Sequence, residues 1–267
     1  MQSKQAISKL FLLLFGVAVF SSCNNFEKLL KNPDYGLKYR EGNRYYGMKK
    51  YDKAVALYEN VMPFYRNTPQ DDTLTVQTAR SYYHMRDYEM SEYYFNAFRR
   101  QFPRSGFIEE VDFYGAMSLF NQSQRSELDQ TQTKQAIQAF NTFERKYPRS
   151  SRIDTTQLLL NELAGKLDEK AYLSAKLYYK TEHYRAAVVA LKNCMKDYPE
   201  SKYKEELMFL VLKSTYLHAV HSIKDKQRDR FQQAVDEYFN LASEFPVSKY
   251  KKEADKIYRD SLEATKS

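Results

Sequence analysis

A four-residue element, aromatic–Pro–x–Ser, occurs four times along the chain and constrains its fold more than any other feature. Its prolines are separated by 45, 51 and 47 residues, at Pro103, Pro148, Pro199 and Pro246. Each proline follows a small residue by twelve positions, and these small residues are Ser91, Ala136, Ala187 and Ala234. A loose period that keeps a fixed internal register indicates a helical solenoid with insertions between its repeats. Because solenoids mostly bind other chains, the pattern favours a binding protein over an enzyme.

Each repeat is predicted to be a pair of amphipathic helices, because apolar residues recur every three or four positions between the prolines. An aromatic–x–x–small signature, as in Tyr51–Ala54 and Tyr184–Ala187, marks the second helix of a pair and lets the two helices approach closely. Proline then ends that helix. A serine follows each proline and can cap the next helix by accepting a backbone N–H bond; the four serines are Ser105, Ser150, Ser201 and Ser248.

The sequence therefore predicts a right-handed all-α solenoid of five helix pairs followed by one capping helix. We place the pairs near residues 33–65, 69–102, 105–147, 150–199 and 201–246, and the capping helix at 248–264. The polar residues 121–133 are predicted to form a loop inside the third pair. Residues 151–181 contain no proline and only one glycine, Gly165, and are predicted to form one long or gently broken helix of about 45 Å.

The pairs resemble the tetratricopeptide repeat, whose hallmark runs aromatic–x–x–Ala and ends at a proline. Such repeats carry a glycine two residues before the aromatic, whereas Lys49, Arg86 and Glu182 stand there in this chain. We therefore expect the turns inside the pairs to differ slightly in conformation from those of regular repeats.

The first 22 residues form a predicted targeting segment and not a part of the fold. Lys4 and Lys9 precede an apolar run, residues 10–20, that is too short to cross a bilayer as a helix. The tetrapeptide Phe-Ser-Ser-Cys at residues 20–23 resembles a bacterial lipobox, although phenylalanine stands where leucine is usual. We expect cleavage before Cys23 and acylation of that cysteine. The alternative is an ordinary cleaved signal in which the cysteine occurs by chance.

The predicted organisation is a signal peptide at 1–22, a lipidated tether at 23–32 and a repeat domain at 33–267. The N-terminal repeats would span about 33–147 and the C-terminal repeats about 150–264. Asn24 and Asn25 follow the cysteine, with no aspartate directly after it. This resembles the sorting pattern of lipoproteins that are held in the outer membrane and face the periplasm.

Several function classes find no support in the sequence. The formal net charge of +8 is interspersed with acidic residues, so there is no basic stripe of the kind that binds nucleic acid. The chain lacks a glycine-rich phosphate loop, Gly-x-Ser-x-Gly and His-Glu-x-x-His, so we predict no catalytic residue and no cofactor. His218 and His221 could share a metal on one helix face, but no further ligand accompanies them. Cys194 has helical spacing with Ala187 and Leu191, which predicts a buried thiol.

Taken in order, these motifs resemble the BamD family, the lipoprotein of the β-barrel assembly machinery in the bacterial outer membrane. The closest stretches are residues 134–150 and 171–201, together with Phe-Ile-Glu-Glu-Val at 107–111. The resemblance implies a non-enzymatic scaffold with two binding surfaces. Its C-terminal repeats would bind the barrel-forming partner BamA, and its N-terminal repeats would receive the C-terminal signal of unfolded outer-membrane proteins.

Two sets of residues are candidates for these contacts. Tyrosines crowd the first two repeats, and a tyrosine offers an extended peptide a flat apolar ring with a hydroxyl, while arginine can meet a terminal carboxylate. The candidate peptide-binding residues are Tyr45, Tyr51, Tyr82, Tyr83, Arg80 and Arg86. The candidate partner-interface residues are Lys192, Lys196 and Arg228. The alternative is that the tyrosines pack between helices and that the charged residues form a solvated face.

Two other functions remain open from the sequence. One is a periplasmic repeat lipoprotein that coordinates cell-wall synthesis with envelope constriction. The other is a glycan-binding lipoprotein with a helical-repeat body, a class that usually has a much longer chain with large inserted loops.

Overall fold

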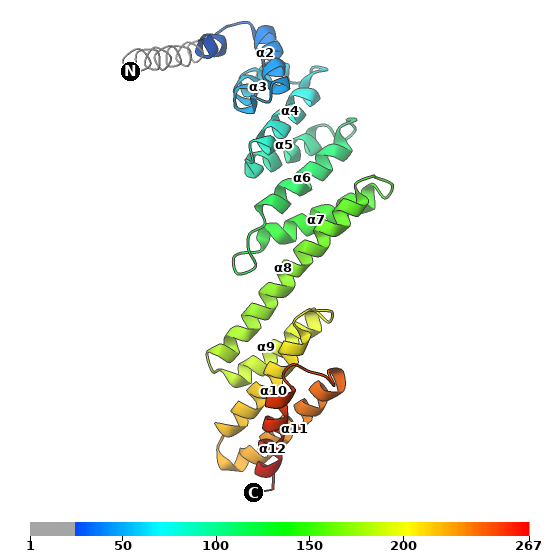
Figure 1. The fold of residues 1–267 in the computed structure, drawn as a ribbon. Coiled ribbons are helices and arrows are strands. Elements are labelled where there is room, and N and C mark those ends of the chain that lie inside the picture. Colours follow the sequence, from blue (N-terminus) through cyan, green and yellow to red (C-terminus); the bar gives the residue numbers. More distant parts are fainter. Residues whose placement is uncertain (1–24, 267) are drawn as a thin grey trace, which may run out of the picture. The chain divides into compact units, whose positions relative to one another are not determined.

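A computed structural model describes residues 25–266, so the predicted signal peptide and Cys23 lie outside the described residues. Within that range the chain is helical, with turns and loops between the helices and no strand, which confirms the predicted fold class (Figure 1). The helices are α2 (Tyr35–Gly47), α3 (Tyr51–Tyr65), α4 (Asp71–His84), α5 (Tyr88–Gln101), α6 (Ile108–Gln122), α7 (Thr131–Lys146), α8 (Ile153–Lys180), α9 (Tyr184–Asp197), α10 (Lys204–Val220), α11 (Lys224–Glu244) and α12 (Lys251–Ala264). They form the five expected pairs, from α2–α3 to α10–α11, with α12 as the closing helix.

The chain divides into two compact units. One unit holds the residues up to Ser123 together with 134–156, and the other holds 124–133 together with the residues from Gln157 onward. The division falls inside α8, which is a single helix of 28 residues, about 42 Å long, as the absence of proline predicts. The loop between α6 and α7 packs on α8 in the second unit, where the Ser126 hydroxyl donates to Glu169 Oε2 at 2.7 Å.

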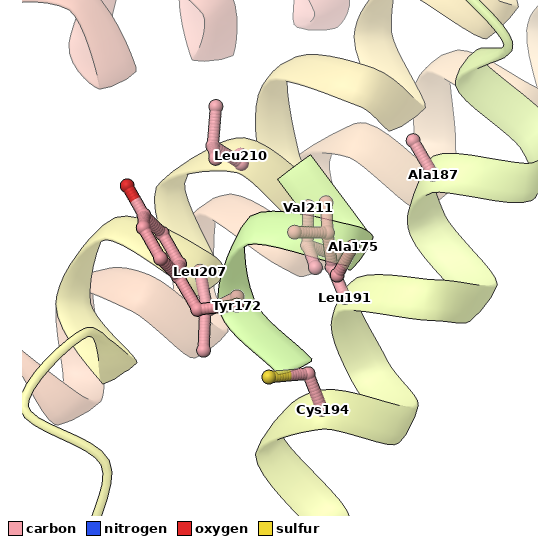
Figure 2. Packing of buried hydrophobic residues seen from close by; sticks show 8 residues of the cluster. All are labelled: Tyr172, Ala175, Ala187, Leu191, Cys194, Leu207, Leu210 and Val211. Carbon is pink, nitrogen blue, oxygen red and sulfur yellow. The ribbon is translucent and has the colours of Figure 1, made fainter. Parts of the chain in front are cut away.

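The small residues of the aromatic–x–x–small signature are fully buried between helices. Ala54, Ser91, Ala187 and Ala234 are all 0% exposed. In the second unit, Figure 2 shows Ala187 in the cluster that Leu191 and Leu207 also form. Cys194 belongs to the same cluster and is 4% exposed, which confirms the prediction of a buried thiol. Burial, together with the nearby Asp168 and Asp197, raises the pKa of Cys194 to about 11.

The serines of the aromatic–Pro–x–Ser element each accept a backbone N–H as predicted, but the donor is the residue just before the helix and not a residue within it. Each stands three residues before its helix and accepts an N–H two residues along, as when Tyr250 N–H donates to Ser248 Oγ at 3.0 Å. Three of the serine hydroxyls also donate to a carboxylate at the start of the preceding repeat. These bonds join Ser105 to Asp72 at 2.9 Å, Ser150 to Glu109 at 2.7 Å and Ser248 to Glu205 at 2.7 Å. The element therefore ties neighbouring repeats together as well as ending a helix.

The turns within three of the pairs keep the conformation that glycine favours, so the expectation of altered turns is wrong. Lys49, Arg86 and Glu182 adopt positive φ angles of 58°, 64° and 62°. The next N–H in each turn donates to the carbonyl five residues back, from Lys50 to Tyr45, from Asp87 to Tyr82 and from His183 to Tyr178. This is the Schellman arrangement, formed with a non-glycine residue in the left-handed position.

We expect Lys49→Gly, Arg86→Gly and Glu182→Gly each to raise the free energy of unfolding by about 0.5–1 kcal/mol. The left-handed conformation strains a residue that has a Cβ by about 1–2 kcal/mol, and glycine's greater freedom in the unfolded chain offsets part of the gain. Urea titration of each variant measures the change. Lys50→Gly is the matched control, because Lys50 has a φ of −89° and glycine should lower stability there. Equal effects at Lys49 and Lys50 would contradict this account.

Candidate functional site

The turns with left-handed residues are also the places where aromatic side chains gather. In each turn, two adjacent tyrosines lie in the last turn of the first helix of the pair. A third tyrosine begins the second helix, five residues after the second tyrosine of that pair. The ring centroids of Tyr46 and Tyr51 lie 5.7 Å apart, and those of Tyr83 and Tyr88 lie 5.5 Å apart. The corresponding pair in the second unit, Tyr179 and Tyr184, lies 6.2 Å apart.

In the first unit these aromatic contacts continue from one repeat to the next. Tyr51 stacks on His84, with 4.6 Å between the ring centroids, and His84 in turn meets the edge of Tyr83. Tyr83 also contacts Tyr114 of α6 at 5.1 Å. Burial, together with the charges of Lys49 and Arg80, lowers the pKa of His84, so this imidazole is neutral at neutral pH. The predicted residues Tyr51 and Tyr83 therefore belong to one continuous, half-buried aromatic cluster.

Arg80 lies beside this cluster and is already paired with a carboxylate. Its Nε and Nη2 donate to the two oxygens of Glu110 at 2.6 and 2.5 Å, and its guanidinium lies over the Phe107 ring. Burial alone would lower the pKa of Arg80, but the hydrogen bonds and charge of Glu110, with a smaller contribution from Tyr46, raise it above its usual value. The geometry is the two-pronged one that arginine also uses with a peptide's terminal carboxylate. Glu110 occupies the position such a ligand would take.

The remaining predicted peptide-binding residues lie apart from Arg80. Tyr82 donates to Glu59 Oε1 at 2.6 Å, and Tyr94 donates to the same oxygen at 2.8 Å. Tyr45 instead packs against Phe26, with 5.6 Å between the ring centroids. Arg86 is exposed at the left-handed position of the α4–α5 turn.

The six predicted residues thus fall into separate groups, and helix geometry explains why. Adjacent residues on a helix point about 100° apart, so Tyr45 diverges from Tyr46 and Tyr82 from Tyr83. A count of tyrosines along the sequence does not reveal this rotation. Nor does the sequence reveal the roles of Glu59 and Glu110, which lie far along the chain from the tyrosines or arginine that they bind.

The second unit carries an open groove of 780 Å³ between the end of α8, α9 and the end of α10. Its walls include Tyr178, Tyr184, Val189, His218 and His221. Tyr184 stacks on His221 at 5.8 Å, repeating the contact of Tyr51 with His84. Val189 is 57% exposed and Tyr178 is 47% exposed, so the groove presents apolar surface to solvent. Burial, with Arg230 and Arg185 nearby, lowers the pKa of His218. The charged residues Glu182 and Arg185 also line the groove.

The predicted partner-interface residues lie outside this groove. Lys192 lines a smaller groove of 450 Å³ formed by α9, α10 and α11, where its Nζ contacts Glu237 Oε1 at 2.5 Å. Lys196 lies one helical turn further along α9 and is exposed. Arg228 is also exposed but lies about 14 Å along α11 from Glu237, since nine residues separate them. Lys192 and Lys196 therefore share a face, and Arg228 lies apart from them.

No helix within residues 25–266 is both long and apolar enough to cross a bilayer. The His, Cys, Asp and Glu side chains of the same residues form no group of three or more that could hold a metal ion.

Comparison with known proteins identifies one matching family. A family model described as "YfiO: Outer membrane lipoprotein" matches residues 35–229 and 165–262. Among solved structures, the chain is similar to the TPR2AB-domain–pHSP90 complex of yeast Sti1, at 14% identity over 85% of this chain and 98% of that one, with a TM-score of 0.39. It is also similar to a TPR repeats protein from Bacteroides fragilis, at 12% identity over 86% of this chain and 99% of that one, with a TM-score of 0.38. No curated protein matches the chain.

Proposed function

The chain belongs to the YfiO family of outer membrane lipoproteins, the BamD family, and on that premise we propose that it is a non-enzymatic scaffold of the β-barrel protein assembly machinery. In this proposal, acyl chains on Cys23 hold the protein in the outer membrane, with the repeats in the periplasm. The C-terminal repeats bind the barrel-forming BamA-like protein, and the N-terminal repeats bind C-terminal segments of unfolded outer-membrane proteins.

The groove at the α8–α9 turn is the observation that carries the partner-binding part of the proposal. The groove is concave and exposes the apolar side chains of Tyr178 and Val189. These residues lie on α8 and α9, whose opposite faces pack in the core of the second unit. Interfaces are centred on such aromatic and aliphatic anchors, while exposed charges at their rims contribute less. We therefore place the partner contact at this groove. Lys192 and Lys196, on another face of α9, would lie at most at its rim.

Purification of the full-length lipoprotein from membranes in mild detergent tests the proposal. Recovery of the barrel-forming partner, identified by mass spectrometry, is the expected result. Recovery of cell-wall synthases without that partner would contradict the assembly role and favour coordination of cell-wall synthesis instead. A preparation made after high-salt washing separates stable partners from weakly bound ones.

The Arg80–Glu110 pair supports peptide binding in the first unit, through exchange of one carboxylate for another. A peptide with an aromatic end and a free carboxylate would displace Glu110 from Arg80 and lay its ring beside Tyr46 and Tyr83. The side chains of Arg80 and Glu110 are 22% and 28% exposed, so an incoming carboxylate can reach the pair. Because Glu110 competes for the guanidinium of Arg80, it lowers the affinity of Arg80 for the carboxylate of the peptide.

We expect Glu110→Gln to strengthen the binding of such a peptide about tenfold, because it frees the guanidinium of Arg80. A hydrogen bond to a charged group contributes about 1.5–3 kcal/mol, which is sufficient for this change. Fluorescence anisotropy with a labelled peptide measures the affinity, and the same peptide with an amidated C-terminus is the control. Arg80→Gln should remove the preference for the free carboxylate. If the Glu110→Gln variant bound the free and the amidated peptide with equal affinity, Arg80 would not be the residue that recognises the terminal carboxylate.

A further inference from the structure

We infer that the α2–α3 turn and the adjoining helical residues 25–30 form a surface that lies against anionic lipid headgroups of the membrane. The inference rests on the proposed acylation of Cys23 for the distance between this surface and the bilayer. It goes beyond the scaffold function, because it assigns the first repeat a second contact with the membrane besides its acyl anchor.

The start of the described chain is fixed against the end of α2. Phe26 meets the ring of Tyr45 edge-on at 5.6 Å, and Lys53 Nζ lies 5.3 Å from the centroid of Phe26 and 5.6 Å from that of Tyr45. Residues 25–30, which belong to the stretch predicted to be a tether (23–32), are helical. Through Phe26 they pack against the end of α2. Only three residue steps separate Phe26 from Cys23, and even a fully extended chain spans about 10 Å over that length. An acylated Cys23 consequently keeps the α2–α3 turn close to the headgroups.

This turn has the side chains that a membrane interface requires. Lys49 and Lys50 are adjacent and exposed, and neither forms an ion pair within residues 25–266. Met48 precedes them and is 49% exposed. Lys53 adds a third positive charge, and Asp52 is the one acidic residue between positions 48 and 53. Basic residues attract anionic lipids, and an exposed apolar side chain can enter the headgroup layer.

The structurally equivalent turns lack this combination. Where the first turn has Met48, Lys49 and Lys50, the α4–α5 turn has Met-Arg-Asp at residues 85–87 and the α8–α9 turn has Thr-Glu-His at 181–183. All three share the same backbone conformation, so the fold does not require the two lysines. The doubled positive charge occurs at the turn nearest the acylation site, which favours a lipid surface as its partner.

Vesicle binding by the unacylated chain tests this surface independently of the acyl anchor. We would use the mature chain with Cys23→Ala and sediment it with vesicles of phosphatidylcholine alone or mixed with phosphatidylglycerol. The parent chain should bind the anionic vesicles, and salt should weaken that binding. Equal binding to vesicles with and without phosphatidylglycerol would overturn the inference.

The decisive variant combines Lys49→Glu and Lys50→Asp. Both residues already occur at the equivalent positions of other turns, as Glu182 and Asp87, so the turn should fold unchanged. Each basic residue near an anionic surface contributes about fivefold to partitioning, so we expect binding to fall by at least about 20-fold. The matched control reverses two exposed lysines of α12, Lys252→Glu with Lys256→Glu, and should retain nearly all binding. An equal loss in both variants would show attraction by net charge alone and would overturn the assigned surface.

A fluorescent probe locates the contact directly. In the Cys23→Ala chain, Met48→Cys supplies an exposed thiol, whereas Cys194 is buried and its raised pKa of about 11 keeps it unreactive. An environment-sensitive dye at position 48 should shift to the blue on anionic vesicles, and a dye at Val247→Cys should not. A shift only at position 247 would contradict the inference. Partner recovery from detergent does not use these lysines, so the failure of one proposal leaves the other standing.

Discussion

Replacing Val189 with glutamate should abolish recovery of the barrel-forming partner while leaving the repeats folded. Val189 is 57% exposed in the α8–α9 groove, so a longer polar side chain meets solvent in the free protein. In the complex, the same carboxylate would lose its hydration against the apolar surface of the partner. Loss of a central interface contact costs about 2–4 kcal/mol, which weakens binding about 30- to 1000-fold. Co-purification from mild detergent, with the partner quantified against the lipoprotein, measures this loss.

The chain supplies a matched control for that substitution. Val247 lies in the connection between α11 and α12 and is 96% exposed, and it does not line the groove. Val247→Glu makes the same replacement of valine by glutamate, and this variant should co-purify with as much partner as the parent protein does. Both variants should keep the parental thermal unfolding midpoint. Normal partner recovery by Val189→Glu would place the interface on another surface.

Replacing Cys23 with alanine should release the protein from the membrane almost completely. Each buried methylene contributes about 0.8 kcal/mol, so loss of several acyl chains removes nearly all of the attachment energy. The repeats should remain folded, because Cys23 precedes the first described helical residue, Asn25. Fractionation of cells into membrane and soluble proteins, with circular dichroism of the released chain, measures both outcomes.

Salt separates the acyl anchor from the lysine surface in this experiment. A small fraction of the Cys23→Ala chain should stay on membranes at low ionic strength through the α2–α3 turn and leave them after a high-salt wash. Cys194→Ala is the matched control and should remain anchored, since Cys194 lies in the core of the second unit (Figure 2). Retention of the Cys23→Ala chain after the wash would show that something other than acylation holds the protein.

The fold could be predicted from sequence because its determinants are local. Proline position, helical spacing of apolar residues and the small residues buried between paired helices all act within one repeat. For this reason the five pairs, the long α8 and the buried Cys194 were predictable. The turn conformation was predicted wrongly, because the rule that glycine marks a left-handed residue fails at Lys49, Arg86 and Glu182. There the surrounding hydrogen bonds impose the conformation despite its strain.

The candidate sites were less predictable because they depend on contacts between repeats. Nothing near Arg80 in sequence shows that Glu110, thirty residues later, holds its guanidinium. The groove in the second unit likewise combines Tyr178, Val189 and His218 from three different helices. A sequence locates such residues on helices, but their rotation and their neighbours in the next repeat follow only from the packed structure.

Depletion of the protein from growing cells, followed by quantification of newly made outer-membrane proteins, tests the assembly role most directly. If this chain is a scaffold for barrel insertion, then β-barrel proteins should fall steeply in the outer membrane while soluble periplasmic proteins keep their levels. Unchanged barrel proteins after full depletion would contradict the proposed function.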